Sequence, residues 1–562
     1  MKPSPSNEPV TLVTGYYLDN FFKILDFVDR WYDDILGPDE WAFSRAFRAV
    51  PLPAQRLYVR LLMRKGPFFR CDKLAYPEIE DVPAAVNALA AAGLLRCCPF
   101  DEPRLVFALL ARAEVEALLR AHRDALPEET PVFRKLKKPE LIALVVTHLD
   151  PSAAATWLQA RFNWVALLGE DVLLRYRLLF FGNSRQDWTE FVLLDLGLLR
   201  YEPVVLLRGD RWFQSRALLD ASVAWLEKRA LCDLAMEAED EAGLAVLGEA
   251  MPPTYDERVL IRRRDRLLNS VGAWLERRGS FEAALAWYHD SSRPPSRERQ
   301  ARLLDKLGRP RQAMAMCRAL LDGPATEEER LFANAFRVKV AKKLGHSMPA
   351  PKRASFPNRT LTLVRDARKR IEHQVLEHLQ EQGMPGFGAE NWFWLSVFGL
   401  IFWDIVYAPV RGAFFNHYQR GPADLFSNAF LAHRHEAVQA RLDWLRLGLP
   451  WLPLAQKVMD EKWGVNNYLV GWDPSLREHV ARIHEQMHGK ALAVLFERLV
   501  THPGLYRTGF PDLLLFPPEG GYRLAEVKGP GDQLQPNQRG WLKYFQANGI
   551  PIEVVRVVWQ TA

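Results

Sequence analysis

The stretch Gly509–Trp559 reads GFPDLLLFPPEGGYRLAEVKGPGDQLQPNQRGWLKYFQANGIPIEVVRVVW. Two short apolar segments in it, residues 513–516 and 522–528, are separated by Pro-Pro-Glu-Gly-Gly. Proline and glycine at these positions favour a tight reversal, so we predict a β-hairpin. A helix over residues 536–547 and a valine-rich strand over residues 552–559 are expected to follow. This order of elements predicts an α/β domain at the end of the chain.

Three charged residues gather at one end of the predicted hairpin. Glu526 and Lys528 are two positions apart on the second strand, so their side chains point to the same face. Asp512 opens the first strand and can lie beside them. Mg²⁺ and Mn²⁺ prefer oxygen ligands, and a neighbouring lysine can activate water or offset negative charge on a phosphoryl group. The pattern predicts a divalent-metal site that cleaves phosphodiester bonds.

The sequence gives little support to two other kinds of site. The segment His484-Glu485-Gln486-Met487-His488 fits the HExxH pattern of helical zinc proteases. No HxxGxxH pattern or obvious third-ligand helix follows it, and His479 on the same predicted helix suggests an ordinary polar face. The chain contains no GxxxxGK[ST] phosphate loop, so we expect no nucleotide cofactor.

Composition describes an ordinary multidomain protein. A chain of 562 residues exceeds one core, so three or four domains are expected. The formal net charge of +6 permits an acidic partner without requiring one. The five cysteines include no CxxC pair, which indicates reduced thiols in the cytoplasm. The N-terminus lacks the apolar segment of a signal peptide.

Residues 392–410, WFWLSVFGLIFWDIVYAPV, are apolar enough to suggest a membrane span. Asp404 lies within this segment, and a carboxylate in the middle of a membrane costs about 2.5–3.5 kcal/mol. We therefore predict a buried core helix and no membrane contact. Glu390 stands at the start of this helix, where the helix dipole favours a carboxylate. A role limited to the helix start is the alternative for Glu390.

Basic segments earlier in the chain are candidates for DNA contact. Residues 1–125 are expected to be helical, with a winged-helix-like unit near residues 83–95. Lys135, Lys137 and Lys138 precede a helix start, where backbone donors and flanking lysines suit a phosphate. This helix-extended-helix segment resembles SAP-type DNA-binding domains. A solvated charged helix start is the alternative.

A repeated pattern follows. Leu275-Glu276-Arg277-Arg278-Gly279 recurs 29 residues later as Leu304-Asp305-Lys306-Leu307-Gly308, each followed by paired alanines. Small residues at fixed spacing predict TPR-like helical hairpins. Arg262 and Arg263 lie in a run of arginines just upstream, as candidates for contact with duplex DNA or as members of a solvated helix. A proline-rich linker, residues 349–357, and a basic helix, residues 363–379, are predicted next.

The C-terminal stretch resembles the VRR-NUC nuclease domain, a restriction-endonuclease-like fold. The match extends beyond Asp512, Glu526 and Lys528 into the EVKGP turn and the helix from Gln538 to Trp541. Further stretches resemble one VRR-NUC family, the Fanconi-associated nucleases: YYLDNFF, QRLYVRLLMRK, LAYPEI, SSRPPSRER and GLIFWDIVYAP. The resemblance spans most of residues 16–560.

The resemblance implies a PD-(D/E)xK nuclease whose mostly helical N-terminal region precedes a C-terminal α/β VRR-NUC domain. It implies four parts: a helical DNA-binding region over residues 1–125, a SAP-type module over 126–235, a TPR-like array over 236–348, and the nuclease domain over 358–562. The implied activities are 5′-flap endonuclease and 5′→3′ exonuclease action on branched DNA in interstrand crosslink repair.

The resemblance also implies roles for site residues. Glu390, Asp512, Glu526 and the Val527 carbonyl would bind one or two Mg²⁺ or Mn²⁺ ions, and Lys528 would be the catalytic lysine. Gln538 matches a helix position near the site. Arg507, just before the motif, is the candidate counterpart of residues that grip a 5′-terminal phosphate.

This sequence differs from the animal members of the family, so not all of their properties are expected here. The upstream ubiquitin-binding zinc finger has no counterpart here, so we expect a bacterial, cytoplasmic, DNA-associated form without ubiquitin-dependent recruitment. Stand-alone VRR-NUC Holliday-junction resolvases are the alternative within nucleases; they are small dimers, whereas this chain suits a monomer on a flap. A catalytically inactive DNA-binding adaptor is the alternative of another class, against which the intact Asp512, Glu526 and Lys528 argue.

Overall fold

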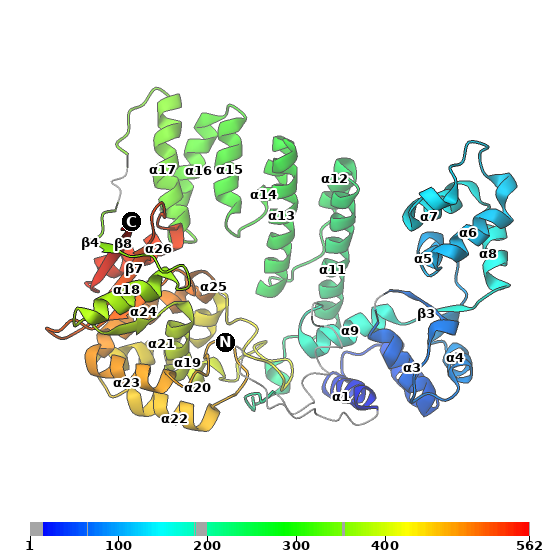
Figure 1. The fold of residues 1–562 in the computed structure, drawn as a ribbon, viewed down its shortest axis with the longest axis horizontal. Coiled ribbons are helices and arrows are strands. Elements are labelled where there is room, and N and C mark those ends of the chain that lie inside the picture. Colours follow the sequence, from blue (N-terminus) through cyan, green and yellow to red (C-terminus); the bar gives the residue numbers. More distant parts are fainter. Residues whose placement is uncertain (1–14, 65, 185, 187–198, 351–353, 561–562) are drawn as a thin grey trace. The chain divides into compact units, whose positions relative to one another are not determined.

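The structure, a computed structural model, describes residues 15–64, 66–184, 186, 199–350 and 354–560. The chain divides into two compact units, Met1–Leu199 and Arg200–Ala562. The first is coloured blue to cyan in Figure 1 and the second runs from cyan-green to red. A mostly helical N-terminal region and a C-terminal α/β domain confirm the predicted fold class.

The first unit combines helices with a small antiparallel sheet of order β1-β3-β2. Its strands are short, and the central strand, β3, is separated from β2 in sequence by several helices. The elements are α1 (Tyr16–Trp31), α2 (Pro38–Ala49), α3 (Leu52–Leu62), β1 (Phe68–Arg70), a 3₁₀ turn (Cys71–Lys73), α4 (Val82–Ala91), β2 (Leu95–Cys97), β3 (Trp164–Leu167) and α9 (Glu170–Phe181).

Between β2 and β3 the chain forms a helical cluster whose apolar core also includes Phe68 of β1 and Trp164 and Ala166 of β3. Its elements are α5 (Pro103–Ala108), α6 (Arg112–Ala121), 3₁₀ turns (Arg123–Ala125 and Phe133–Lys135), α7 (Lys138–His148) and α8 (Pro151–Gln159). The predicted boundary at residue 125 falls between α6 and α7, which pack against each other. Residues 185 and 187–198 of the predicted SAP-type module lie outside the described residues.

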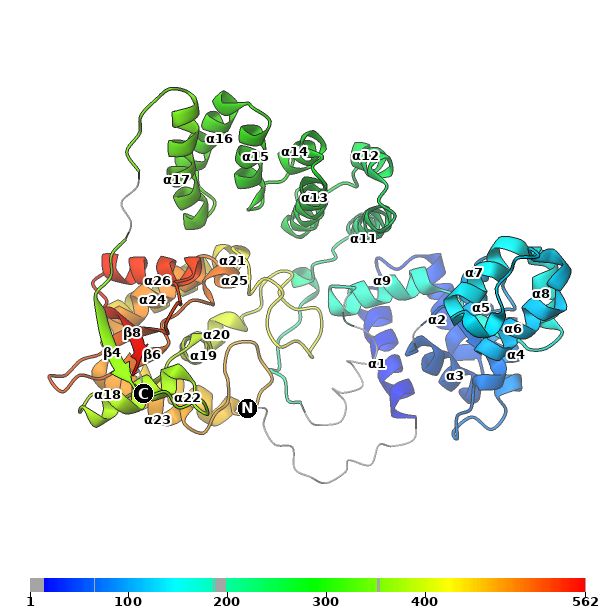
Figure 2. The same cartoon turned by 45° about the horizontal axis from the view of Figure 1, so that its top comes forward.

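The second unit begins with a row of paired helices, visible in Figure 2 from α11 to α17. They are α11 (Arg216–Glu237), α12 (Glu241–Glu249), α13 (Arg258–Arg278), α14 (Phe281–His289), α15 (Ser296–Lys306), α16 (Pro310–Asp322) and α17 (Glu327–Lys343), after a 3₁₀ turn at Arg208–Asp210. The predicted boundary at residue 235 therefore falls inside α11. Of the predicted linker, residues 351–353 lie outside the described part.

The repeated pattern marks the turns of this helical array. Gly279 and Gly308 both have positive φ values, +89° and +72°, and each follows the end of a helix. The alanines Ala284 and Ala313 that come next are fully buried, at 0% exposure. Small buried side chains let neighbouring helices approach closely, as the spacing predicted.

The C-terminal domain is built on a five-stranded mixed sheet of order β4-β8-β7-β6-β5. Its strands are β4 (Asn358–Leu363), β5 (Gly386–Gly388), β6 (Leu513–Leu515), β7 (Arg523–Lys528) and β8 (Ile552–Trp559). Its helices are α18 (Ile371–Glu381), α19 (Asn391–Ile401), α20 (Trp403–Val406), α21 (Ala429–Arg446), α22 (Leu452–Lys462), α23 (Leu476–Gln486), α24 (Gly489–Thr501), α25 (Pro503–Tyr506) and α26 (Pro536–Ala547). The predicted hairpin, helix and final strand are confirmed.

The basic helix predicted over residues 363–379 is wrong in its first half. Residues 358–363 form β4, which pairs in parallel with β8, and the helix begins only at Ile371. Leu361 and Leu363 alternate with polar residues and are buried on one face. This two-residue period is that of a strand.

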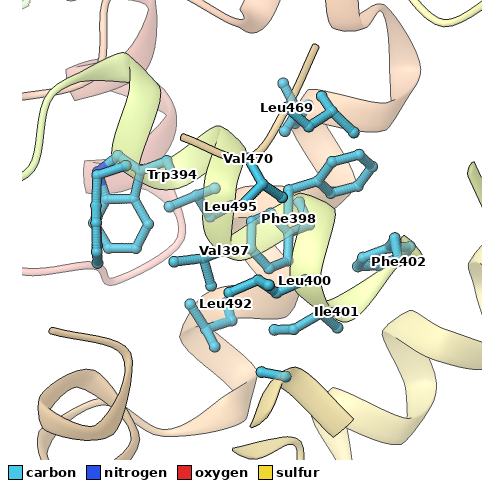
Figure 3. Close-up of a cluster of buried hydrophobic side chains, with 14 of the residues drawn as sticks. Trp394, Val397, Phe398, Leu400, Ile401, Phe402, Leu469, Val470, Leu492 and Leu495 are labelled. Atoms are coloured by element: carbon cyan, nitrogen blue, oxygen red, sulfur yellow. The ribbon is translucent and has the colours of Figure 1, made fainter. Parts of the chain in front are cut away.

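The apolar segment 392–410 lies in the domain core but is not one continuous helix. α19 ends at Ile401, and Phe402 (φ −112°, ψ 16°) separates it from α20. Figure 3 shows its side chains packed among those of α24 and the segment containing Leu469. No helix in the described part of the chain is long and apolar enough to cross a membrane.

Two apolar layers cover the sheet. Leu514 and Leu524 belong to the large core that includes α19, α24 and α26. Leu513 and Val527, an odd number of positions from Leu514 and Leu524 along their strands, belong to a smaller core with α18. Because side chains alternate along a strand, Glu526 shares the face of Leu524.

Candidate active site

The hairpin brings Asp512 and Glu526 together. β6 and β7 pair antiparallel with Leu513 opposite Ala525, so the next position along the ladder sets Asp512 opposite Glu526. Oδ2 of Asp512 accepts a hydrogen bond from the N–H of Val527 at 2.8 Å. Nζ of Lys528 lies 2.7 Å from Oε1 of Glu526. The three residues predicted from the motif therefore share one site.

Burial gives both carboxyl groups unusual affinities for protons. It raises the pKa of Glu526 to about 8, with the charge of Asp512 adding to the shift and the contact with Lys528 opposing it. Burial also raises the pKa of Asp512 to about 6, and the hydrogen bond from Val527 opposes this shift. Burial therefore disfavours the charged form of each carboxyl group more strongly than the contacts with Lys528 and Val527 favour it.

Backbone pairing delivers Glu390 to the same edge of the sheet. β5 pairs with β6, and beyond the last pair the N–H of Ala389 donates to the Asp512 carbonyl at 2.8 Å. Glu390 follows at once as the residue preceding α19. The next residue, Asn391, accepts from the N–H groups of Gly509 and Phe510 at 2.8 and 3.2 Å. Asn391 thereby ties the start of α19 to the chain entering the motif.

Two residues that the sequence interpretation missed lie at this site. Arg370 contacts Glu390 (Nη2 to Oε1, 3.3 Å) and Glu372 (Nε to Oε2, 3.5 Å). The charge of Glu372 also contributes to the raised pKa values of Asp512 and Glu526. No local motif marks either residue; their position just before and within the first turn of α18 was the only available signal.

The site fits a divalent cation through its carboxylates. Beyond its contact with Lys528, neither carboxylate oxygen of the fully buried Glu526 has a hydrogen-bond partner. A buried charge without partners is costly, and a cation would relieve that cost. Within the described residues, no three His, Cys, Asp or Glu side chains already surround one point as a preformed metal site. One oxygen of Glu390 contacts Arg370, so a cation at this carboxylate would share it with that guanidinium.

The lysines expected to contact DNA lie in the first unit. Lys135 ends a 3₁₀ turn and Lys137 immediately precedes α7; both side chains are exposed. Lys138 is half-buried, and its Nζ donates to the carbonyl of Ala108 at 2.8 Å. Lys135 and Lys137 therefore offer exposed charge, whereas Lys138 joins α7 to the end of α5.

The two candidate arginines of α13 differ in their surroundings. Arg263 donates to the Ser222 carbonyl at 3.3 Å and lies over the Trp212 ring at 5.8 Å, so it packs α13 against neighbouring elements. Burial and the positive charge of Arg266 lower the pKa of Arg262; the charge of Asp424 opposes this shift, and Arg293 and Arg258 add to it. Arg262 thus belongs to a group of crowded positive charges, a favourable setting for a polyanion.

The remaining predicted residues have other local contacts. Oε1 of Gln538 accepts from the N–H of Gln535 at 2.9 Å and caps α26, so its side chain is engaged at the helix start. Arg507 is exposed and lies over the Phe426 ring at 4.6 Å. It follows α25, five residues before Asp512.

The HExxH segment does not have the geometry of a zinc protease. α23 ends at Gln486, Met487 is extended, and His488 precedes α24. The two histidines therefore do not lie one turn apart on one helix. His484 packs edge-on against Trp451, with 5.1 Å between ring centroids.

Comparison with known proteins gives matches along the whole chain. The family model "FAN1, HTH domain" matches residues 15–96, and the VRR-NUC domain model matches residues 454–559. A Fanconi-associated nuclease 1 homolog of Pseudomonas aeruginosa is 35% identical over 99% of this chain and 98% of its own length. The Arabidopsis thaliana homolog is 25% identical over 97% of this chain and 67% of its own length.

Solved structures also resemble the chain. The crystal structure of paFAN1 bound to 2nt 5′flap DNA with gap superposes with a TM-score of 0.85 at 32% identity, covering 99% of this chain and 100% of that chain. The complex with 1nt 5′flap DNA with gap gives a TM-score of 0.84 at 33% identity.

Proposed function

Because the chain belongs to the Fanconi-associated nuclease family, we propose that it is a divalent-metal-dependent 5′-flap endonuclease and 5′→3′ exonuclease. The observation that carries the proposal is the buried Glu526, opposite Asp512 and 2.7 Å from Lys528. We further infer that it acts on branched DNA in the bacterial cytoplasm during interstrand crosslink repair. The flap complexes of paFAN1, similar over the full chain, support the choice of substrate.

The residues divide the chemistry among them. Asp512 and Glu526 would hold Mg²⁺ or Mn²⁺, with Glu390 and the Val527 carbonyl as further ligands. Such a cation neutralises charge on the phosphoryl group. The Lys528 ammonium is positioned to orient a water molecule and to stabilise negative charge as the water attacks phosphorus. The P–O3′ bond breaks, leaving a 5′-phosphate and a 3′-hydroxyl.

The remainder of the chain supplies surfaces for duplex arms. Exposed Lys135 and Lys137, and the crowded arginines around Arg262, are proposed to contact phosphates. We propose that residues 1–125 form the helical DNA-binding region, that residues 126–235 act as the SAP-type module, that the array over residues 236–348 binds duplex DNA, and that residues 358–562 cut. These long helical parts argue against a small dimeric junction resolvase.

Cleavage of labelled DNA tests the proposal. End-labelled 5′-flap, 3′-flap and four-way-junction DNA are incubated with the full chain in Mn²⁺, in Mg²⁺ and in EDTA. We expect metal-dependent cuts near the 5′-flap junction and weak cutting of the other two. Preferred cutting of four-way junctions would favour a resolvase, and no cutting of any substrate would contradict a nuclease.

A further inference from the structure

An exposed tryptophan lies next to the proposed metal ligands. Trp392 is two residues after Glu390, in the first turn of α19. It is 41% exposed, although its helix neighbours Phe393 and Trp394 are fully buried at 0%. Two residues along a chain have Cα atoms no more than about 7 Å apart, so the indole starts close to the catalytic carboxylates.

A loop holds this indole in place. The segment between α22 and α23 brings Gly471 against Trp392, where an added Cβ would lie 3.3 Å from ring atom Cε3. Buried Ser396 joins the two: its Oγ accepts from the N–H of Gly471 at 2.9 Å and donates to the Trp392 carbonyl at 2.8 Å. Asn467 braces the loop by accepting from the N–H groups of Leu469 and Val470 at 2.8 and 2.6 Å.

The same loop also presents aromatic surface accompanied by positive charge. Tyr468 is 48% exposed, and the guanidinium of Arg420 lies over its ring at 4.5 Å. Phe426 contacts Tyr468 edge-on at 5.5 Å and has Arg507 over its own ring at 4.6 Å. Aromatic rings interleaved with arginines suit a strand of nucleotides, whose bases stack while its phosphates meet cations.

We propose that Trp392 stacks against a nucleobase of the substrate strand beside the scissile phosphate and thereby positions that phosphate at the carboxylates. This inference rests on the proposed nuclease function. The occupant is a nucleotide of the DNA substrate, because Trp392 follows the proposed metal ligand Glu390 by two residues and the loop that contacts its indole also carries Tyr468 with Arg420 over its ring. An indole held rigid before binding loses little freedom when a base stacks on it.

An abasic scan combined with substitution tests the proposal. A single abasic nucleotide is moved stepwise through the unpaired strand and the first base pairs of a 5′-flap DNA, and single-turnover cleavage is measured in Mn²⁺. We expect Trp392→Ala to lower kcat/KM about tenfold on intact DNA, as loss of one stacked base should. We also expect that an abasic nucleotide at one position slows cleavage by the wild type by a similar factor. At that position, the abasic DNA and the intact DNA should be cut by Trp392→Ala at the same rate.

Controls separate stacking from a structural effect. Trp392→Phe should restore most of the activity, and Mn²⁺ affinity should be unchanged in both variants. Leu447→Ala removes an apolar side chain that is 77% exposed after α21, outside the loop between α22 and α23, and should leave the abasic profile as in the wild type. Equal abasic penalties in wild type and Trp392→Ala at every position would overturn the proposal.

Binding measured without cleavage distinguishes this inference from the proposed function. In EDTA, 2-aminopurine placed at the sensitive position should be quenched by the wild type and by Trp392→Phe, and less by Trp392→Ala. If the wild type cuts no DNA, the proposed function fails, while this quenching still tests stacking. Absence of quenching at every position would contradict stacking even if the enzyme cuts.

Discussion

At the scale of single residues, the site consists of the buried Glu526 in contact with Lys528 and the partly exposed carboxylates of Asp512 and Glu390. Asp512 and Glu526 were predictable because a short hairpin fixes both their spacing and their shared face. Glu390 was predictable as a helix-start residue, but its contact with Arg370 was not. Contacts of Arg370 and Glu372 depend on how α18 meets the sheet, which no local pattern encodes.

The raised pKa values predict how stability depends on pH without metal. The pKa of Glu526 is raised to about 8, so the folded protein retains a proton that the unfolded chain has released. The contribution of the protonated Glu526 carboxyl group to the free energy of unfolding is fully present below the ordinary carboxyl pKa. It is lost as the pH rises to about 8. Thermal unfolding in EDTA should therefore show Glu526→Gln gaining stability relative to the wild type between pH 5 and pH 8.5.

Mn²⁺ should reverse the loss of wild-type stability with rising pH. Metal binding must displace the protons of Glu526 and Asp512, so Mn²⁺ should stabilise the wild type increasingly above pH 6 and stabilise Glu526→Gln much less. The same unfolding experiment repeated in Mn²⁺ measures this. If the melting temperatures of the wild type and of Glu526→Gln change in the same way with pH and with Mn²⁺, the proposed role of Glu526 is wrong.

At the scale of elements, pairing between β5 and β6 sets the position of Glu390. The final helix and strand of the domain followed from periodicity, and so did the strand–turn–strand hairpin. β4 was not predicted, and the basic helix was placed from its last residue, Leu363, because the charged residues that follow suggested an earlier helix start than Ile371. β3 was missed because it returns to β1 and β2 after a separate helical cluster, a pairing distant in sequence.

Two glycines of β5 form a matched pair for testing this element. A Cβ at Gly386 would lie 2.4 Å from the Leu514 carbonyl oxygen, whereas one at Gly388 would meet nothing within 4 Å. Gly386→Ala should separate β5 from β6, destabilise the protein by about 1–3 kcal/mol and slow cleavage by displacing Glu390. Chemical unfolding and single-turnover rates measure both effects.

Gly388→Ala is the control in the same strand. It should leave cleavage unchanged and alter stability by less than about 1 kcal/mol, because the new methyl group meets no neighbour. Equal effects of the two substitutions would show that β5 does not position the site.

At the scale of the whole molecule, a net charge of only +6 leaves DNA affinity to local groups. The family assignment extends along the full chain, as the sequence resemblance predicted. Boundaries between the helical parts were harder to predict. The cluster α5–α8 interrupts a sheet and α11 continues through residue 235, and neither feature changes the local helical pattern.

Adjacent arginines on α13 should respond differently to substitution. Arg262→Ala should weaken binding to duplex DNA and reduce the slope of log affinity against log salt by about 1, because one phosphate contact is lost. Arg263→Ala should mainly lower the melting temperature, since Arg263 donates to the Ser222 carbonyl. Binding isotherms in EDTA at several salt concentrations, with melting curves, separate the two. An unchanged salt slope in Arg262→Ala would remove Arg262 from the DNA-binding surface.

The most direct test of the metal-dependent site is the single-turnover rate of cutting a 5′-flap DNA in Mn²⁺ by Asp512→Asn. This variant keeps the side-chain shape and removes the charge at the point where Val527 holds the carboxylate. We expect the rate to fall about a thousandfold or more, with flap affinity in EDTA within about threefold of the wild type. Cutting at the wild-type rate would contradict this expectation.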